Sequence, residues 1–427
     1  MRASKNKNPL RAHVYVRISK INRIEYIHYQ TSDQVVSLDY SNKLHMLVTS
    51  MSFDEMTAKA FRVSSFTVVG HLLHINLKDH LLEFKHEIGA ALLNKNTRAL
   101  AVVNKVNSID NTYRNFDIEV IAKRPGVENA DEELMIVEVN ENKCRFKFDF
   151  SKVYWNSRLS TEHERIIGKL NKSTDVVVDL FAGVGPFAVP AAKGKCQTYA
   201  NDLNPEAVKW LELNMSRNKV NSSMYKIYNK DARDFILDDL RPLLLDEYKR
   251  VDDEELATKP KIHILMNLPA LAPTFLTNFI GLFGSDDKKT QINSKPLLNL
   301  FREQNLDHVV YCYCFLKGVY EDPKAEVRAM IEENLGRPLN DNQLLDIFRV
   351  RNVAVYKDMY RVEIRLDESL LFGSKSIMKN GRNPTSWPNK RVMIDDSAKK
   401  RSHDDCDKTV DEDNHKKAKV TDYCSII

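Results

Sequence analysis

Four polar residues end four strand-like segments in the second half of the chain, and they are the residues best placed to do chemistry. The segments and residues are Val176–Val178 with Asp179, Gln197–Ala200 with Asp202, Lys226–Tyr228 with Asp231, and Ile262–Met266 with Asn267. Because the carboxyl ends of parallel strands meet at one edge of an open α/β sheet, we expect these side chains to surround a ligand. The series predicts a nucleotide-binding fold.

A short glycine turn, Ala182-Gly183-Val184-Gly185, lies between the first two of these segments. Glycines let a ligand approach the backbone, and an acid about 20 residues on, here Asp202, can bind a ribose diol. A dinucleotide turn requires G-x-G-x-x-G, which this chain lacks. Two glycines after an acid-ended strand fit S-adenosylmethionine better, because that ligand has no pyrophosphate. An ordinary strand, turn and helix is the alternative reading of this pattern alone.

The ligand contacts follow from these positions. Asp202 would accept hydrogen bonds from the ribose hydroxyls and Asp231 from the adenine amine, while the glycine turn leaves room for the methionine part. We predict a cofactor-binding set made up of Asp179, Phe181, Gly183, Gly185, Asp202, Leu203, Asp231, Ala232, Asn267 and Pro269.

The acceptor is indicated by Asn267-Leu-Pro-Ala270, which resembles the N-P-P-Y element of enzymes that methylate amino groups on bases. Ala270 replaces the stacking aromatic, which argues against an exocyclic amine, and the absence of a cysteine there argues against C5 of a pyrimidine. A protonated ring nitrogen needs a carboxylate base and a cation for the charge left on the neighbouring oxygen. Glu162 and Arg114 are candidates, although a surface acid and a solvated arginine are the plainer interpretations.

Composition excludes several classes of protein. The 427 residues carry a formal net charge of +5, which is compatible with an RNA partner without indicating one. Six cysteines show no C-x-x-C pair and no histidine at ligand spacing, which predicts a reducing compartment and no metal site. No apolar run is long enough to span a membrane. Cys312 and Cys314 alternate with tyrosines in a strand-like run, so we expect them to be buried.

The chain divides by composition into four regions. Residues 1–62 are basic, and a mitochondrial transit peptide and a solvated arm explain them equally well. We predict an α+β RNA-binding and active-site domain over 63–165, a Rossmann-type S-adenosylmethionine-binding domain over 166–370, and a disordered charged tail over 371–427. Within the second domain we expect a helix over Pro323–Leu335, one strand over Val353–Leu366 and a charged excursion over Leu240–Lys259. Lys399-Lys-Arg401 in the tail resembles part of a bipartite nuclear signal.

Several longer motifs make the resemblance specific. They are GHLLHINLKDHLLEFKHEIG, NSIDNTYRNFDIEV, DFSKVYWNSRLSTEHERI, DLFAGVGPFAVPAAK, NDLNPEAVKWLELN, NKDARDF, MNLPALA and VAVYKDMYRVEIRL. Together they resemble the archaeal and eukaryotic tRNA (guanine37-N1)-methyltransferase family over residues 68–366. The resemblance implies a class I Rossmann-type methyltransferase fold, S-adenosylmethionine as methyl donor, and N1 of the guanosine 3′ of the anticodon as acceptor. The first 60 residues do not match the N-terminal region of that family.

The resemblance also implies roles for individual residues. Glu162 matches the general base, Arg114 the arginine that stabilises the O6 charge, and Asn267 the asparagine of the N-L-P element. The predicted substrate-binding residues are Tyr154, Arg158 and His163.

Two other functions stay open from the sequence. A wyosine-pathway tRNA aminocarboxypropyltransferase uses the same cofactor, and a methyltransferase-like scaffold would only bind RNA. For the methyltransferase we expect a monomer that binds the anticodon stem-loop of tRNA, and no membrane partner. We expect it in the cytoplasm and nucleus, with a further pool in the mitochondrial matrix.

Overall fold

The computed structural model describes residues 66–106, 117–253, 259–284 and 294–373, together with the backbone of five short strands nearer the N-terminus. Those strands are β1 (His13–Ile18), β2 (Ile24–Gln30), β3 (Val35–Asp39), β4 (Leu44–His45) and β5 (Arg62–Val63). The order β1–β2–β3 forms one antiparallel sheet, and β4 pairs with β5. Arg114, the expected disordered tail and its nuclear signal lie outside the described residues.

The chain folds as two compact units. The first comprises Met1–Ser173 and Ala182–Asn229, and the second comprises Thr174–Phe181 and Lys230–Ile427. No helix among the described residues is long and apolar enough to cross a membrane.

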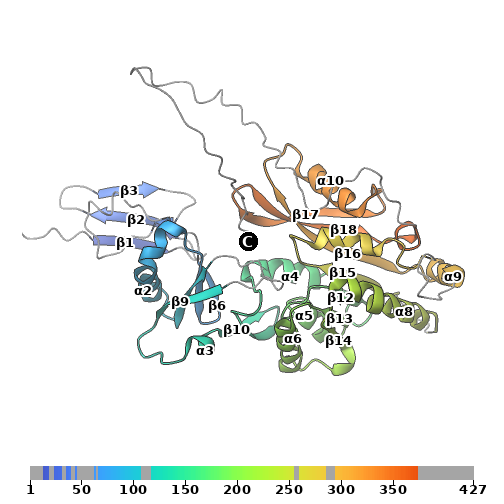
Figure 1. The fold of residues 1–427 in the computed structure, drawn as a ribbon, viewed down its shortest axis with the longest axis horizontal. Helices are drawn as coiled ribbons and strands as arrows, with labels where there is room; N and C mark the ends of the chain where they lie inside the picture. The colour runs from blue at the N-terminus through green and yellow to red at the C-terminus, as the bar shows by residue number, and fades with distance from the viewer. Residues whose placement is uncertain are drawn as a thin grey trace, which may run out of the picture. The chain divides into compact units, whose positions relative to one another are not determined.

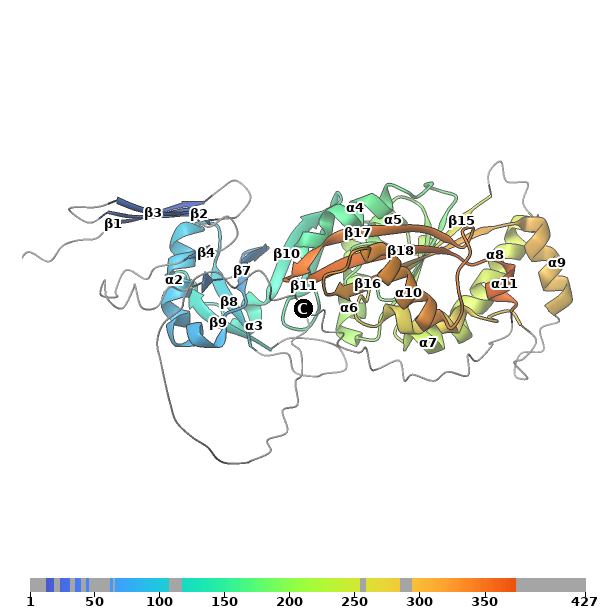
Figure 2. The same cartoon turned by 90° about the horizontal axis from the view of Figure 1, so that it is seen from above.

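A four-stranded sheet with one packed helix begins the described part of the first unit. The sheet order is β6 (Thr67–Val69), β7 (Leu72–Ile75), β8 (Ala101–Val106) and β9 (Asp117–Lys123). Helix α2 (Lys85–Lys95) packs on β8 and β9 (Figure 2). Ile88 and Leu92 on the helix meet Val102 and Ile121 on the strands in one buried cluster, which is what the helical spacing of the sequence predicts.

The first unit continues with a hairpin and seven helical segments. The bounds are η1 (Asp79–Phe84), α3 (Asp131–Leu134), β10 (Ile136–Glu141), β11 (Cys144–Asp149), η2 (Ser157–Leu159), α4 (Ser160–Ile167), α5 (Ala188–Lys193), α6 (Pro205–Arg217) and η3 (Ser222–Met224). Helix α6 packs on β11, and its Asn214 and Asn218 side chains hydrogen-bond the β11 backbone. The helix is thereby fixed to the hairpin by polar as well as apolar contacts.

A seven-stranded sheet organises the rest of the chain. Its order is β14 (Tyr225–Tyr228), β13 (Gln197–Asn201), β12 (Val176–Asp179), β15 (Lys261–Met266), β16 (Asp307–Lys317), β18 (Lys357–Arg365) and β17 (Leu344–Ala354). β12, β15 and β16 run parallel, whereas β18 and β17 are antiparallel to their neighbours. The α/β fold expected from the sequence is confirmed, with antiparallel strands at one end.

The parallel strands read as continuous apolar runs because both of their faces are covered. Every residue of β12 is buried, as are Cys312 and Cys314 of β16, so the expectation that these cysteines are packing residues is confirmed. Helix α10 (Pro323–Leu335) packs on β16 and β17 and has the bounds that the sequence predicts (Figure 1). Asp322 caps it through the amides of Lys324 and Ala325.

Two expectations about the second unit were wrong. The charged excursion over 240–259 contains helix α8 (Arg241–Asp253), because Leu243, Leu244 and Tyr248 give it a buried face. The single strand over 353–366 is instead the end of β17, a turn at Val355–Tyr356, and β18. The remaining segments are α7 (Ala232–Asp234), η4 (Phe235–Leu240), η5 (Ala272–Phe279), α9 (Ser294–Gln304) and α11 (Glu368–Leu371).

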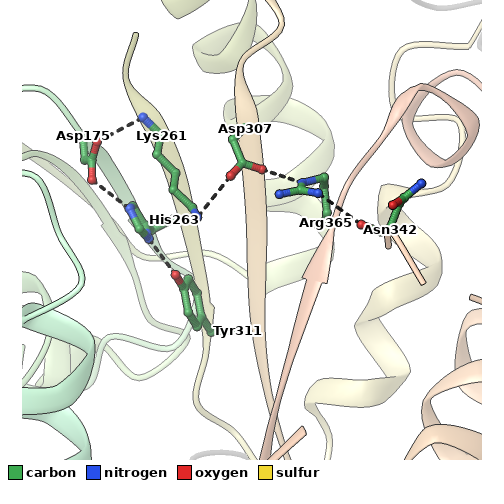
Figure 3. A network of polar contacts seen from close by, with 7 residues as sticks. All are labelled: Asp175, Lys261, His263, Asp307, Tyr311, Asn342 and Arg365. Carbon is green, nitrogen blue, oxygen red and sulfur yellow. Dashed lines mark hydrogen bonds and ion pairs between the residues drawn. The ribbon is translucent and has the colours of Figure 1, made fainter. Parts of the chain in front are cut away.

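A polar network joins the amino ends of the parallel strands (Figure 3). Buried His263 lies between the Asp175 carboxylate and the Tyr311 hydroxyl, at 2.9 Å from each. Asp307 forms ion pairs with Lys261 at 3.1 Å and with Arg365 at 2.9 Å. These contacts cross-link β12, β15, β16 and β18 at the edge opposite the carboxyl ends, which leaves the carboxyl edge for a ligand.

A buried histidine makes the stability of the fold depend on pH. His308 Nε2 lies 2.8 Å from the Tyr248 hydroxyl, and burial lowers the pKa of His308 to about 4. Below pH ~6.5 the His308 ring binds a proton in the unfolded chain, whereas in the folded protein it does not bind one until the pH falls to about 4. Stability is therefore full above pH ~6.5, and we expect the free energy of unfolding to fall by about 3 kcal/mol as the pH drops to 4.

Chemical denaturation at several pH values measures this loss. His308→Gln has no titrating ring, so its stability should start lower and depend less on pH over this range. Equal slopes for the variant and the wild type would assign the acid sensitivity to other groups, such as His74, whose pKa burial also lowers to about 4.

Candidate active site

The two glycines of the turn are required for different reasons. Gly183 and Gly185 both have positive φ, +53° and +98°. A Cβ at Gly185 would lie 2.6 Å from Leu211 Cδ1 and from Val189 Cγ2, whereas a Cβ at Gly183 would meet nothing within 4 Å. Gly185 therefore permits close packing of the protein, and Gly183 leaves open space that a ligand can occupy.

Alanine at each glycine separates these roles. Gly185→Ala should destabilise the protein by about 2 kcal/mol or more, because overpacking adds to backbone strain. Gly183→Ala should destabilise the protein by only about 1 kcal/mol, because the sole cost is that of an alanine at positive φ. Its methyl group would, however, fill the space proposed for the ligand. We expect Gly183→Ala to lose cofactor affinity in calorimetry while its melting temperature changes less than that of Gly185→Ala. Equal losses of stability with unchanged affinity would make both glycines purely structural.

Asp202 fixes the glycine turn from the end of the neighbouring strand. Its Oδ2 accepts from the Gly183 amide at 2.7 Å, and its Oδ1 accepts from the Asn204 amide at 2.9 Å. Burial raises the pKa of the Asp202 carboxyl, and these two amides oppose the rise. Each oxygen keeps a second lone pair with which to accept from a ligand hydroxyl. The exposed Leu203 next to it offers an apolar surface.

Helix α6 is held at the same place by a side-chain cap at its first turn. The Asn204 side chain accepts from the Glu206 amide at 3.0 Å, and Pro205 opens the helix. The Asn204 amide group also donates to the Lys152 carbonyl at 2.9 Å.

Glu162 is a buried acid on the first turn of α4. Its side chain is only 3% exposed, and Oε2 pairs with Nη1 of Arg165 one turn later. A buried carboxylate held by one cation keeps its orientation, which a general base requires.

His163, next along α4, is held in the protein interior. Its Nδ1 lies 2.5 Å from Glu141 Oε1, and its ring meets the Phe187 ring edge-on at 4.6 Å between centroids. These contacts give His163 a role in positioning α4 that the sequence did not predict. Nε2 is buried and has no partner among the described residues, so substrate binding by that atom stays a prediction.

Tyr154 and Arg158 lie in the loop before α4. Tyr154 is 52% exposed, and its hydroxyl accepts from the Asn156 side chain at 3.2 Å. The Arg158 amide donates to the same Asn156 side chain, which caps η2. Tyr154 is thus an exposed aromatic residue, and its contact with the substrate stays a prediction.

A cationic group around His74 was missed by the sequence analysis. Burial lowers the pKa of His74, and the positive charges of Lys105 and Arg158 lower it further. Burial also lowers the pKa of Lys105 to about 8. No sequence signal marks this group, because its members come from β7, β8 and η2. Such a group favours an anion.

Asp179 and Asp231 belong to the second unit. Asp179, at the end of β12, is fully buried and accepts from the Phe181 amide at 3.4 Å. Asp231 accepts from the Arg233 amide at 2.8 Å and from its guanidinium at 3.1 Å, and it begins α7 with the buried Ala232. The Arg233 guanidinium lies 4.6 Å from the centre of the Phe275 ring, which is edge-on to Phe181 at 5.2 Å. Phe181 and Asp231 therefore share one aromatic neighbourhood.

Asn267 carries an unsatisfied buried acceptor. Its Oδ1 is inaccessible to solvent and has no hydrogen-bond partner among the described residues. The Leu268 carbonyl accepts from the amides of Leu271 and Ala272, so a turn immediately follows β15 and includes Pro269. A buried acceptor without a donor calls for an explanation, and a ligand N–H group at the carboxyl end of β15 would supply the donor.

The described residues contain no group of three His, Cys, Asp or Glu side chains arranged to hold a metal ion.

Comparisons with known proteins agree with this geometry. Residues 137–283 match the TRM5/TYW2 methyltransferase domain, and residues 54–126 match the TYW2 N-terminal domain. The tRNA (guanine(37)-N(1))-methyltransferase of Drosophila pseudoobscura pseudoobscura is 47% identical over 318 residues, which are 74% of this chain and 66% of that protein. The enzyme of the same name from Ciona intestinalis is 41% identical over 339 residues, 79% of this chain and 67% of that one. The chain spans about two thirds of the length of these two relatives.

A solved structure supports the fold. Trm5b from Pyrococcus abyssi superposes with a TM-score of 0.51 at 24% identity, covering 79% of this chain and 84% of that one.

The sheet order and the match to the methyltransferase domain define a Rossmann-type methyltransferase fold. The sequence identity to the insect and tunicate enzymes assigns the chain to one family among the proteins with this fold. The chain belongs to the TRM5/TYW2 methyltransferase family. The resemblance found in the sequence is thereby confirmed.

Proposed function

We propose that this protein is a tRNA (guanine37-N1)-methyltransferase, which transfers a methyl group from S-adenosylmethionine to N1 of the guanosine 3′ of the anticodon. The observation that carries the proposal is 47% identity over 318 residues to a protein named for that reaction. The buried carboxylate of Glu162 and the unsatisfied Asn267 oxygen supply the chemistry that the reaction requires.

The cofactor would be held by residues that fit it. Gly183 leaves space beside the turn, Asp202 offers free lone pairs to ribose hydroxyls, and Asp231 would accept from the adenine amine. The rings of Phe181 and Phe275 offer an apolar contact. When bound, S-adenosylmethionine supplies a methyl group on a positively charged sulfur.

The chain's own residues would make N1 of guanine nucleophilic. Glu162 would take the N1 proton, which leaves an electron pair on N1 for the bond to the methyl group that the bound cofactor would supply. Arg114 would stabilise the negative charge that develops on O6. Asn267 Oδ1 accepts from the amino group of the base and so orients its ring. Tyr154, Arg158 and His163 complete the proposed substrate site.

A second function rests on a specific observation. Residues 54–126 match the TYW2 N-terminal domain, which favours the wyosine-pathway aminocarboxypropyltransferase as the alternative. The same cofactor would then give up a different carbon chain. The Asn267-Leu-Pro269 element favours methyl transfer. A scaffold that only binds RNA would tolerate the loss of Glu162, Asp202 and Asn267, and the chain retains all three.

We further propose that the partner is the anticodon stem-loop of tRNA and that the protein acts as a monomer. We propose the cytoplasm and nucleus as its compartments, with a pool in the mitochondrial matrix.

An assay on unmodified tRNA transcripts tests the proposed function. One transcript carries guanosine 3′ of the anticodon and its control carries adenosine, and the product nucleoside is identified by mass. We expect N1-methylguanosine from the first and no product from the second. An aminocarboxypropyl product would assign the protein to the wyosine pathway, and tight tRNA binding without product would identify a scaffold.

A further inference from the structure

Strands β16, β18 and β17 extend past the carboxyl ends of the other parallel strands as an antiparallel tongue. β15 ends at Met266, which lies opposite Cys312, and β16 continues to Lys317. At about 3.3 Å per residue, the tongue projects roughly 16 Å beyond the end of β15. Figures 1 and 2 show its three strands side by side. Its tip, Lys317–Val319 with Val355–Lys357, therefore lies beyond the edge that carries Asp179 and Asn267.

The tip exposes large apolar side chains. Val355 is 80% exposed, Tyr356 62% and Val319 61%, which makes them the three most exposed large hydrophobic side chains among the described residues. Single exposed hydrophobic residues are ordinary on a protein surface, but three at one tip mark a binding surface.

The turn itself is built from residues that do not favour turns. Ala354 pairs with Lys357, which leaves Val355 and Tyr356 as a two-residue turn, and Tyr356 has φ +57°. Asn or Gly would adopt this conformation without strain. The Tyr356 carbonyl accepts from the Gly318 amide at 2.8 Å, which ties the turn to the end of β16. A strained tyrosine held on an exposed turn indicates a functional position.

The charges of the tip indicate an anionic ligand. Lys317 and Lys357 stand directly opposite each other across β16 and β18, an arrangement that is destabilising for like charges. Lys357 Nζ lies 4.1 Å from the centre of the Phe315 ring. The neighbouring acid, Asp358, is already engaged by Arg349 at 2.9 Å. Two cations on the same face of a strand pair favour an anion.

We propose that the tip of the tongue binds unpaired nucleotides of the RNA substrate next to the modified base. Tyr356 stacks on a base, while Lys317 and Lys357 contact the phosphates on either side. Exposed aromatic rings interleaved with cations are the chemistry by which proteins hold single-stranded RNA. The identity of this ligand rests on the proposed function, because that function makes RNA the substrate.

Tyr356→Asn tests the stacking contact without endangering the fold, because Asn tolerates positive φ better than Tyr. We expect the Kd for a tRNA transcript to rise about fivefold or more, with the cofactor affinity unchanged and the melting temperature equal or higher. Lys317→Gln combined with Lys357→Gln should reduce the dependence of tRNA affinity on salt. Matched controls are Leu237→Asn, at an exposed leucine on η4, and Lys226→Gln, on β14.

Unchanged tRNA affinity in Tyr356→Asn, at an unchanged melting temperature, would overturn the proposal. So would a change in the protein's mass in solution in place of a loss of RNA affinity, because that result would make a second copy of the chain the ligand. The wild-type protein could also bind tRNA through the tip and form no N1-methylguanosine. That result would refute the proposed reaction and support RNA binding by the tip of the tongue. Absence of any RNA binding by the wild type would overturn both.

Discussion

Glu162→Gln should lower the rate of methyl transfer about 10³-fold, because a positioned general base contributes 10²- to 10⁴-fold to such reactions. Glutamine keeps the size of the side chain and a hydrogen-bonding oxygen for Arg165, so the fold and both ligand sites should survive. The measurement is single-turnover transfer to a tRNA transcript, with tRNA and cofactor affinities determined separately. We expect the single-turnover rate to fall while the Kd values for tRNA and for the cofactor stay within about twofold of those of the wild type.

Glu164→Gln is the matched control, since Glu164 is exposed on the same helix two residues away. It should retain wild-type activity. If Glu162→Gln also transfers methyl groups at nearly the wild-type rate, Glu162 is not the base, and its ion pair with Arg165 only stabilises α4.

Asp202→Ala should raise the Kd for S-adenosylmethionine about 100-fold. The variant loses the hydrogen bonds that Asp202 accepts from Gly183 and Asn204 and the proposed bonds to the ribose, and about 3 kcal/mol corresponds to that factor. Calorimetric titration with the cofactor measures the change, and tRNA affinity in the absence of cofactor should be unaffected.

Asp202→Asn refines the test, because an amide can accept from one backbone N–H but not from both. Its loss of affinity should fall between those of the wild type and Asp202→Ala. Asp238→Ala, at an exposed acid on η4, controls for the change of charge. Unchanged cofactor affinity in Asp202→Ala would remove Asp202 from the ribose role and leave it as a residue that holds the turn.

Local sequence patterns were sufficient for the parallel strands of the sheet and for two helices. The β-branched run before Asp179 is buried on both faces, as such runs are in parallel sheets. Asn204-Pro205 opens α6, and α10 has the predicted bounds, because capping and proline act within one turn of the chain. Turn chemistry failed at Val355–Tyr356, since neither residue is a turn signal, and β17 and β18 therefore read as one strand.

By itself the sequence determined the fold class and the family, since these depend on spacing and on neighbours along the chain. Only the tertiary structure decided what each residue meets. It separated Gly183, where a Cβ would meet no atom, from the packed Gly185, and it paired Glu162 with Arg165 and His163 with Glu141. It also left Asn267 Oδ1 buried without a donor among the described residues. The physical reason is that burial, charge and steric fit depend on residues brought together from distant segments, and no local pattern records those neighbours.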